Sequence, residues 1–369
     1  MASTMTSSSM SARCGGDSHS LTTIIRVLIF CFSCHLLPST FARSLPRNGR
    51  PLQADATSRL LFVFGDSYAD TGNTPSSSPS WHPPYGITWP GSPSGRFCNG
   101  FIQTDILAAT LGVPSPTPYS RLSDGAPNPS DGINFAVAGS GVTYALGTPR
   151  LSIQATWFEG LATAGLFDPE DLKRAVFLIS VVGNDYAAYN GSTLEGYIPL
   201  THSVAYLIDQ NLRVLYSLGA RNFVVPSIAP ITCLPSRTSK SGYVECERNA
   251  TVNKVVALHN HLLGTRLMKI TRDLEGSSVL YLPQTKAMMH VLENLAEFNL
   301  TEGLRPCVIG TNTTTGGIIA CDNPEQHFFW DAMHPTQAGW RAVMSLYTNR
   351  TRSIGFSPSL RNWLKSLPT

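Results

Sequence analysis

A serine follows the first apolar run of the sequence at a position where its hydroxyl could act as a nucleophile. Ser67 stands two residues after Gly65, in the segment Gly65-Asp66-Ser67-Tyr68. A serine on a strand-to-helix turn exposes its hydroxyl, and its backbone N–H joins the unpaired donors of the helix start, which favour an anion. A helix cap is the alternative interpretation, since Gly-Asp-Ser is also a common turn sequence.

Two further motifs place hydrogen-bond donors where predicted strands end. Gly139 closes the apolar run 132–139, and a glycine lets its backbone N–H approach a ligand closely. Asn184 follows the run 175–183, and its carboxamide can donate a neutral hydrogen bond. The alternatives are a simple turn at Gly139 and a helix cap at Asn184-Asp185.

An Asp-x-x-His motif near the carboxyl end offers a general base. The spacing of Asp331 and His334 places both on one face of a helical turn, so the carboxylate can accept a hydrogen bond from the imidazole Nδ1–H, fix the tautomer and leave Nε2 as a base. Pro335 is well suited to begin the following helix. A surface Asp beside a satisfied His is the alternative for this pair. His259 and His261 are expected on a solvated helix face.

Together, in chain order, these motifs supply a nucleophile, two donors for a developing oxyanion, and a base with its orienting carboxylate. That combination indicates acyl transfer. The aromatic, proline-rich segment 81–97 either rims an apolar acyl site or packs as a structured loop.

The elements that must position these residues alternate between strand and helix. Near-continuous apolar runs predict buried strands, and apolar residues at helical spacing predict the helices between them. This alternation predicts an α/β fold with a parallel sheet covered on both faces, where ligands bind beyond the carboxyl ends of the strands. A single domain is expected over 58–364. The expected strands are 59–65, 132–139, 175–183, 222–228 and 278–283, and the expected helices 204–218, 252–267 and 338–347.

Composition excludes several classes of protein. Apolar residues make up 42% of the chain and charged residues 14%, which argues against disorder. A net charge of +3, scattered along the chain, argues against a nucleic-acid partner. No metal-ligand cluster occurs in the sequence after the leader, so no metal or other cofactor is expected, and nothing points to an obligate protein partner.

The amino-terminal region resembles a secretory signal. An apolar run of signal-core length follows Arg26, and small residues precede a cleavage site near Ala42. We therefore expect a signal peptide at 1–42, an extension at 43–57 and an extracellular protein without stable membrane insertion. An uncleaved anchor and a plastid transit peptide are the alternatives. Glycosylation sequons, which suit a secreted protein, stand at Asn190, Asn249, Asn299, Asn312 and Asn349.

Cysteine placement also suits an oxidising compartment. Cys233 and Cys246 bracket one polar loop and Cys307 and Cys321 another, so each pair is a disulfide candidate. Zinc binding is the alternative, but the mature chain lacks Cys-x-x-Cys and His-x-x-x-His motifs. Cys98 remains and is expected to be a buried free thiol.

With these motifs in this order, the chain resembles the plant GDSL-type esterase/lipases of the SGNH-hydrolase superfamily. The resemblance rests on four blocks in order: Phe64-Gly-Asp-Ser67-Tyr-Ala-Asp-Thr-Gly-Asn73, Gly132-Ile-Asn-Phe-Ala-Val-Ala-Gly139, Gly183-Asn184-Asp185 and Asp331-Ala-Met-His334-Pro335. The segment 90–100 also resembles one typical of the plant branch. Tyr68 replaces the leucine of the family name, and Val137 and Ala138 stand where small residues are frequent.

The resemblance implies a three-layer α/β/α flavodoxin-like sandwich and a secreted hydrolase of the apoplast or cell wall. It implies Ser67 as nucleophile, His334 as base, Asp331 as its orienter, and the Ser67 N–H, Gly139 N–H and Asn184 side chain as the oxyanion hole. A small-molecule or lipid ester is the expected substrate. A carbohydrate O-acetyl esterase, a secreted acyltransferase and a binding or defence glycoprotein on an inactive scaffold are the alternatives.

Overall fold

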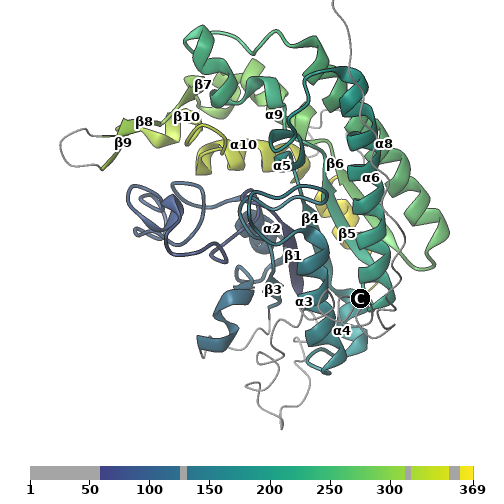
Figure 1. Ribbon diagram of the computed structural model, residues 1–369. Coiled ribbons are helices and arrows are strands. Elements are labelled where there is room, and N and C mark those ends of the chain that lie inside the picture. Colours follow the sequence, from purple (N-terminus) through teal and green to yellow (C-terminus); the bar gives the residue numbers. More distant parts are fainter. Residues whose placement is uncertain (1–58, 125–130, 312–316, 349–357, 369) are drawn as a thin grey trace, which may run out of the picture. The chain divides into compact units, whose positions relative to one another are not determined.

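The computed structural model describes residues 59–124, 131–311, 317–348 and 358–368 (Figure 1). All of the described residues belong to one compact unit of the chain. The predicted signal peptide and extension at 1–42 and 43–57 therefore lie outside the described residues.

A six-stranded sheet lies at the centre of this unit. Its strand order is β2-β3-β1-β4-β5-β6, and every neighbouring pair is parallel. The strands are β1 (Leu61–Gly65), β2 (Thr117–Pro118), β3 (Ile133–Asn134), β4 (Val176–Ser180), β5 (Asn222–Pro226) and β6 (Ser278–Leu282). The predicted parallel α/β sheet is confirmed. The strand expected at 132–139 is shorter, although Val137 N still donates to Gly65 O at 3.0 Å beyond its end.

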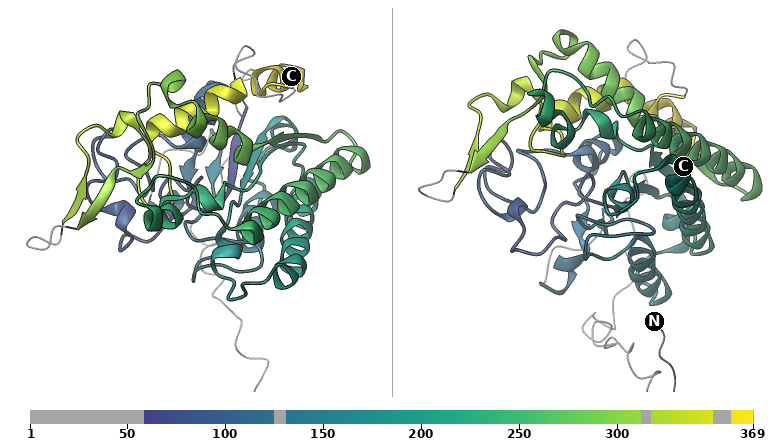
Figure 2. Two further views of the ribbon diagram at one scale, coloured as in Figure 1. Left: turned by 90° about the horizontal axis from the view of Figure 1, so that it is seen from above. Right: turned by 45° about the horizontal axis from the view of Figure 1, so that its top comes forward.

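Helices cover both faces of this sheet (Figures 1 and 2). On one side, α3 contacts β1, α8 contacts β6, and α6 packs between α3 and α8. Helices α2, α9, α10 and α11 share the core on the other side. The bounds are α2 (Gln103–Leu111), α3 (Leu151–Thr163), α6 (Leu194–Ser217), α8 (Ala250–Asp273), α9 (Gln284–Glu293), α10 (Gln337–Thr348) and α11 (Leu360–Ser366), with short helices α4 (Pro169–Arg174), α5 (Asn184–Ala187) and α7 (Pro235–Thr238) between them.

Alternating side chains of β1 explain why the sheet is buried on both faces. Leu61 and Val63 join the core that contains α2 and α10. Phe62 and Phe64 point the other way and meet Phe158 of α3, with ring centroids 5.1 and 5.9 Å apart. Because successive side chains of a strand point to opposite faces, an all-apolar run such as β1 must lie between two helical layers.

A long segment between β1 and α2 packs against two small accessory sheets that the sequence did not predict. β7 (Glu302–Pro306) pairs with β10 (His327–Phe329) in parallel, and β8 (Val308–Thr311) pairs with β9 (Ile318–Ala320) in antiparallel fashion. Tyr85 of the long segment shares a buried cluster with Cys307 and Trp330. Arg96 ties the segment to α2 through Asp105, at 2.8 and 3.0 Å.

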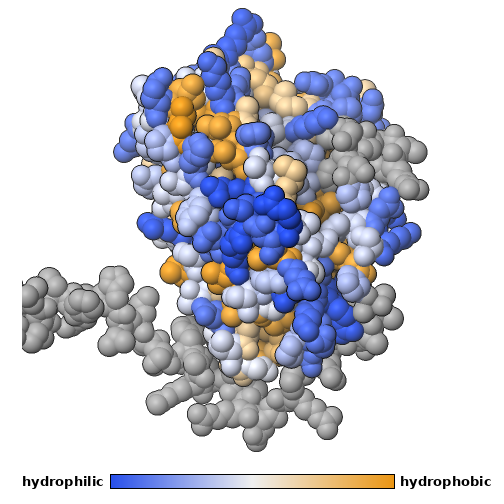
Figure 3. Space-filling view, turned by 90° about the vertical axis from the view of Figure 1, so that its right-hand side faces the viewer, coloured by the Kyte–Doolittle hydropathy of each residue, from blue (hydrophilic) through white to orange (hydrophobic). Residues whose placement is uncertain are grey.

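Hydrophilic side chains predominate on the face that α6 and α8 cover, with smaller apolar patches between them (Figure 3). Asp209 of α6 links the two helices, since it contacts Arg213 at 2.8 Å and Arg266 of α8 at 3.3 Å. Within the described ranges, no helix is both long enough and apolar enough to cross a membrane.

Candidate active site

The turn after β1 presents Ser67 at the carboxyl edge of the sheet. Asp66 N donates to Ser180 O at 3.0 Å, which fastens the turn to the end of β4. The Asp66 carboxylate in turn accepts from Tyr68 N (3.0 Å) and Val182 N (2.8 Å). Gly65 is required here, because a Cβ on it would stand 2.0 Å from the Ser180 carbonyl oxygen. These contacts fix the backbone and leave the Ser67 hydroxyl partly exposed.

Asp66 itself is fully buried beneath the turn. Burial raises its pKa to about 7, although the hydrogen bonds from Val182 and Tyr68 act in the opposite direction. Its carboxyl group therefore accepts hydrogen bonds from the segments that follow β1 and β4 and joins these two strand ends.

His334 lies between Ser67 and Asp331. Its Nε2 is 2.8 Å from Ser67 Oγ, and its Nδ1 is 2.7 and 2.9 Å from the two carboxylate oxygens of Asp331. The backbone N–H groups of Met333 and His334 also donate to Asp331 Oδ1. A tight turn after β10 holds this arrangement, since Trp330 N donates to His334 O at 2.7 Å.

The Asp331 carboxylate is buried yet held in its ionised form. Burial alone would raise its pKa, but the nearby His334 and the hydrogen bonds from His334 and Met333 outweigh burial and lower the pKa below its ordinary value. A negative charge is thus available beside Nδ1 of His334, where it can stabilise an imidazolium.

Two aromatic residues of the long segment complete this cluster, and sequence reasoning did not assign them this role. The Tyr85 hydroxyl donates to Asp331 Oδ2 at 2.9 Å. The Phe97 ring stacks on His334, with centroids 4.8 Å apart. Both were expected either to rim a site or to pack the loop. Their contacts span more than two hundred residues of sequence, so no local pattern signals them.

Asn184 lines the same cavity as Ser67 and contacts the residue that follows Gly139, whereas Gly139 is not among the lining residues. Asn184 Nδ2 donates to Ser140 O at 2.8 Å, and Asp70 Oδ2 accepts from Ala138 N at 2.9 Å. Gly139 adopts a φ of +82°, a left-handed conformation that favours glycine. Among the hydrogen bonds of the described ranges, none uses the backbone N–H of Ser67 or Gly139 as donor. Both donors are therefore free for a ligand.

Asp185 organises the loop that follows Gly139 rather than simply capping a helix. Its Oδ1 accepts from Thr143 N at 2.6 Å and from Tyr144 N at 2.7 Å. Because Asn184 and Asp185 are adjacent, the end of β4 fixes both the carboxamide and the loop that carries Gly139.

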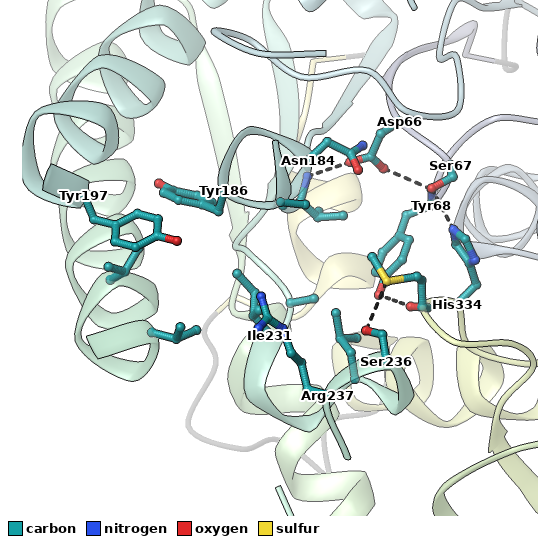
Figure 4. A pocket seen from close by; sticks show the side chains of 18 residues that line it. Asp66, Ser67, Tyr68, Asn184, Tyr186, Tyr197, Ile231, Ser236, Arg237 and His334 are labelled. Atoms are coloured by element: carbon teal, nitrogen blue, oxygen red, sulfur yellow. Dashed lines mark hydrogen bonds between the residues drawn. The ribbon is translucent and has the colours of Figure 1, made fainter. Parts of the chain in front are cut away.

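A cavity of about 270 Å³ begins at Ser67 and extends toward α6 and α8 (Figure 4). Asn184 and His334 line the end near Ser67, while Tyr186 and Tyr197 lie at its other end. Most of the remaining wall is apolar and comes from the segments after β4 and β5, from α8 and from the turn before His334. These apolar residues are Val182, Ala187, Ala229, Ile231, Leu234, Val252, Val255 and Met333.

The expectation for His259 is wrong. It is buried rather than solvated, with 1% of its surface exposed, and its Nδ1 lies 2.8 Å from the Tyr186 hydroxyl. Burial lowers its pKa to about 4. His259 therefore contacts the hydroxyl of Tyr186 but does not itself line the cavity.

Both cysteine pairs form disulfides, Cys233–Cys246 and Cys307–Cys321, and Cys98 is a buried free thiol. Of the glycosylation candidates, Asn190 and Asn299 are exposed, and Asn249 is half-buried and caps α8 by accepting from Val252 N. Asn312 and Asn349 lie outside the described residues.

Comparison with known proteins places the chain in a family. Residues 61–346 match the family model of the GDSL-like lipase/acylhydrolases. Two GDSL esterase/lipases of Arabidopsis thaliana are 35% and 38% identical, covering 90% and 78% of this chain and 98% and 85% of their own lengths. Acetylajmalan esterase 2 of Rauvolfia serpentina is 29% identical over 77% of this chain and 88% of its own length. The chain therefore belongs to the GDSL-like lipase/acylhydrolase family.

Proposed function

We propose that this chain is a secreted serine esterase that hydrolyses carboxylic esters through an acyl-enzyme. The family supports ester hydrolysis, and the names of the relatives are those of esterases and lipases. The observation that carries the mechanism is the chain of contacts from Ser67 Oγ to His334 Nε2 (2.8 Å) and from His334 Nδ1 to Asp331 (2.7 Å).

In the first half-reaction, His334 Nε2 takes the proton of Ser67 as the Oγ atom attacks the ester carbonyl carbon. The carbonyl oxygen becomes an oxyanion that accepts hydrogen bonds from the Ser67 N–H, the Gly139 N–H and the Asn184 carboxamide. The tetrahedral intermediate collapses, His334 returns the proton to the leaving alcohol, and the acyl group remains on Ser67.

In the second half-reaction, His334 Nε2 takes a proton from water, which attacks the acyl carbonyl. Collapse releases the carboxylic acid and restores the Ser67 hydroxyl. Asp331 remains ionised throughout and stabilises the imidazolium in both halves.

The apolar wall of the cavity favours an acyl ester or lipid substrate. Secretion follows from the predicted signal at 1–42 and suits the two disulfides, which persist in oxidising compartments. Among the sequons of the described residues, carbohydrate in the same compartment would attach at Asn190 and Asn299, which are exposed.

Hydrolysis of p-nitrophenyl esters from acetate to long acyl chains tests this proposal. Wild-type protein should hydrolyse at least one ester, and Ser67→Ala should reduce the rate by about 10⁴-fold. Ser217→Ala, which removes an exposed hydroxyl at the end of α6, is the matched control and should retain full activity. Absence of activity on every ester, or equal activity in Ser67→Ala, would favour a binding glycoprotein instead.

A further inference from the structure

The mostly apolar cavity contains one arginine, Arg237 (Figure 4). It belongs to the short helix α7, and in the close view it lies between the Ser67 end and the two tyrosines. An apolar ester alone would gain nothing from a guanidinium group in this position, since burying a charge against an uncharged ligand is unfavourable.

The guanidinium group has unused hydrogen-bonding capacity. Its nearest anionic partner is Glu247, and Arg237 Nη1 lies 3.7 Å from Glu247 Oε2, beyond hydrogen-bond distance. Within the part of the chain that the structure describes, no acceptor takes a hydrogen bond from this side chain. An arginine carries five N–H donors in a planar fork, so a ligand can occupy several of them. The side chain is 40% exposed, which leaves it open to a ligand.

The backbone of Arg237 is fixed relative to the reactive residues. Arg237 N donates to Leu234 O at 2.8 Å, and the neighbouring Ser236 N donates to Ala332 O at 2.9 Å, within the turn that carries His334. The Cys233–Cys246 disulfide closes the loop around α7. The backbone from which the Arg237 side chain extends is therefore fixed relative to the turn that carries His334.

We propose that the physiological ester carries a carboxylate in the part that occupies this cavity, and that Arg237 binds this carboxylate. The proposal rests on the esterase function proposed above. A guanidinium fork matches the two oxygens of a carboxylate. A single arginine with a glutamate beside it suits one negative charge better than a phosphate, which carries more charge and recruits several cations. Arg237 is thus a specificity-determining residue.

Two pairs of substrates test the proposal, because the carboxylate could belong to the acyl or to the alcohol part. The first pair is a monomethyl ester of a straight-chain dicarboxylic acid and the neutral methyl ester of the same chain length. The second pair is the acetate of an ω-hydroxy carboxylic acid and the neutral alkyl acetate of the same chain length. For each pair, the ratio of kcat/KM for the anionic over the neutral ester is measured.

In at least one pair, Arg237→Gln should lower this ratio by about tenfold, mainly through KM, while kcat/KM for the neutral ester is retained. Arg237→Lys should recover part of the ratio. The matched control is Arg248→Gln, which removes an exposed arginine of the same segment that pairs with Glu245 and does not line the cavity.

The proposal is overturned if Arg237→Gln leaves both ratios unchanged while neutral esters are hydrolysed normally. Loss of neutral-ester hydrolysis in Arg237→Gln would also overturn it, because it would show a general structural role. By contrast, failure of wild-type protein to hydrolyse any ester would refute the proposed function itself.

Discussion

Replacing Asn184 with alanine removes one of the three donors proposed for the oxyanion. The carboxamide has two N–H bonds, and one of them already donates to the Ser140 carbonyl at 2.8 Å. That contact holds the group in place and leaves the second N–H for the substrate oxygen. Loss of one such donor typically costs 10²–10³-fold in kcat, equivalent to about 3–4 kcal/mol, and KM should change little because the oxyanion forms in the transition state.

The substitution also has a structural cost, which a matched variant measures separately. Asn184→Ala leaves the Ser140 carbonyl without this donor, so the free energy of unfolding should fall by about 1–3 kcal/mol. Asn222, at the amino end of β5 and away from the cavity, makes the same kind of long-range bond, from its Nδ2 to Lys173 O at 2.8 Å and to Ala175 O at 3.0 Å. Asn222→Ala should therefore lose comparable stability and keep its kcat.

Steady-state hydrolysis of a p-nitrophenyl ester, with urea unfolding of the same preparations, provides the assay. The reasoning is refuted if Asn184→Ala retains wild-type kcat. It is equally refuted if Asn222→Ala loses as much kcat as Asn184→Ala, because the loss of kcat would then be explained by lost stability and not by the missing oxyanion donor.

Two further substitutions test contacts that only the structure shows. Tyr85→Phe removes the hydroxyl that donates to Asp331 Oδ2. In the same assay, kcat should fall by about tenfold with KM unchanged. An unchanged kcat would show that the backbone N–H groups position the carboxylate without Tyr85. His259→Gln tests the pH dependence of stability. Burial lowers the pKa of His259 in the folded protein to about 4 from its ordinary value of 6.5, so as pH falls this histidine is protonated in the unfolded chain before it is protonated in the folded protein. From pH 7 to pH 5 the wild-type protein should therefore lose about 2 kcal/mol more unfolding free energy than His259→Gln, measured with urea, and parallel losses would contradict the buried neutral imidazole.

The sheet and most of the site could be predicted from the sequence because their signals are local. The apolar run of β1 must be covered on both faces, and the carboxyl ends of parallel strands meet at one edge. Ser67 and Asn184 each lie within four residues of such an end, so their proximity is a consequence of topology. The i, i+3 spacing of Asp331 and His334 likewise predicts that their side chains are in contact.

Residues whose roles depend on distant contacts could not be predicted in this way. Tyr85 reaches Asp331 only because the long segment packs against the β8–β9 hairpin, which is itself closed by the Cys307–Cys321 disulfide. Arg237 enters the cavity through a short helix whose direction depends on tertiary contacts. No periodicity in either segment signals these positions.

The burial of His259 could have been predicted from the apolar pattern of its helix. It stands three residues after Val256 and four before Leu263, and both of these are buried residues of α8. The apolar stripe of the helix therefore passes through position 259. A histidine on such a stripe is buried when a neighbour accepts or donates a hydrogen bond, here the Tyr186 hydroxyl.

Covalent labelling with a phosphonate ester probe, followed by peptide mass spectrometry, tests the proposed nucleophile most directly. Because His334 Nε2 is within 2.8 Å of Ser67 Oγ, Ser67 should be labelled stoichiometrically, with parallel loss of esterase activity and no labelling in His334→Ala. An active protein that carries its label on another residue, or that stays unlabelled at Ser67 while activity is lost, would contradict the mechanism.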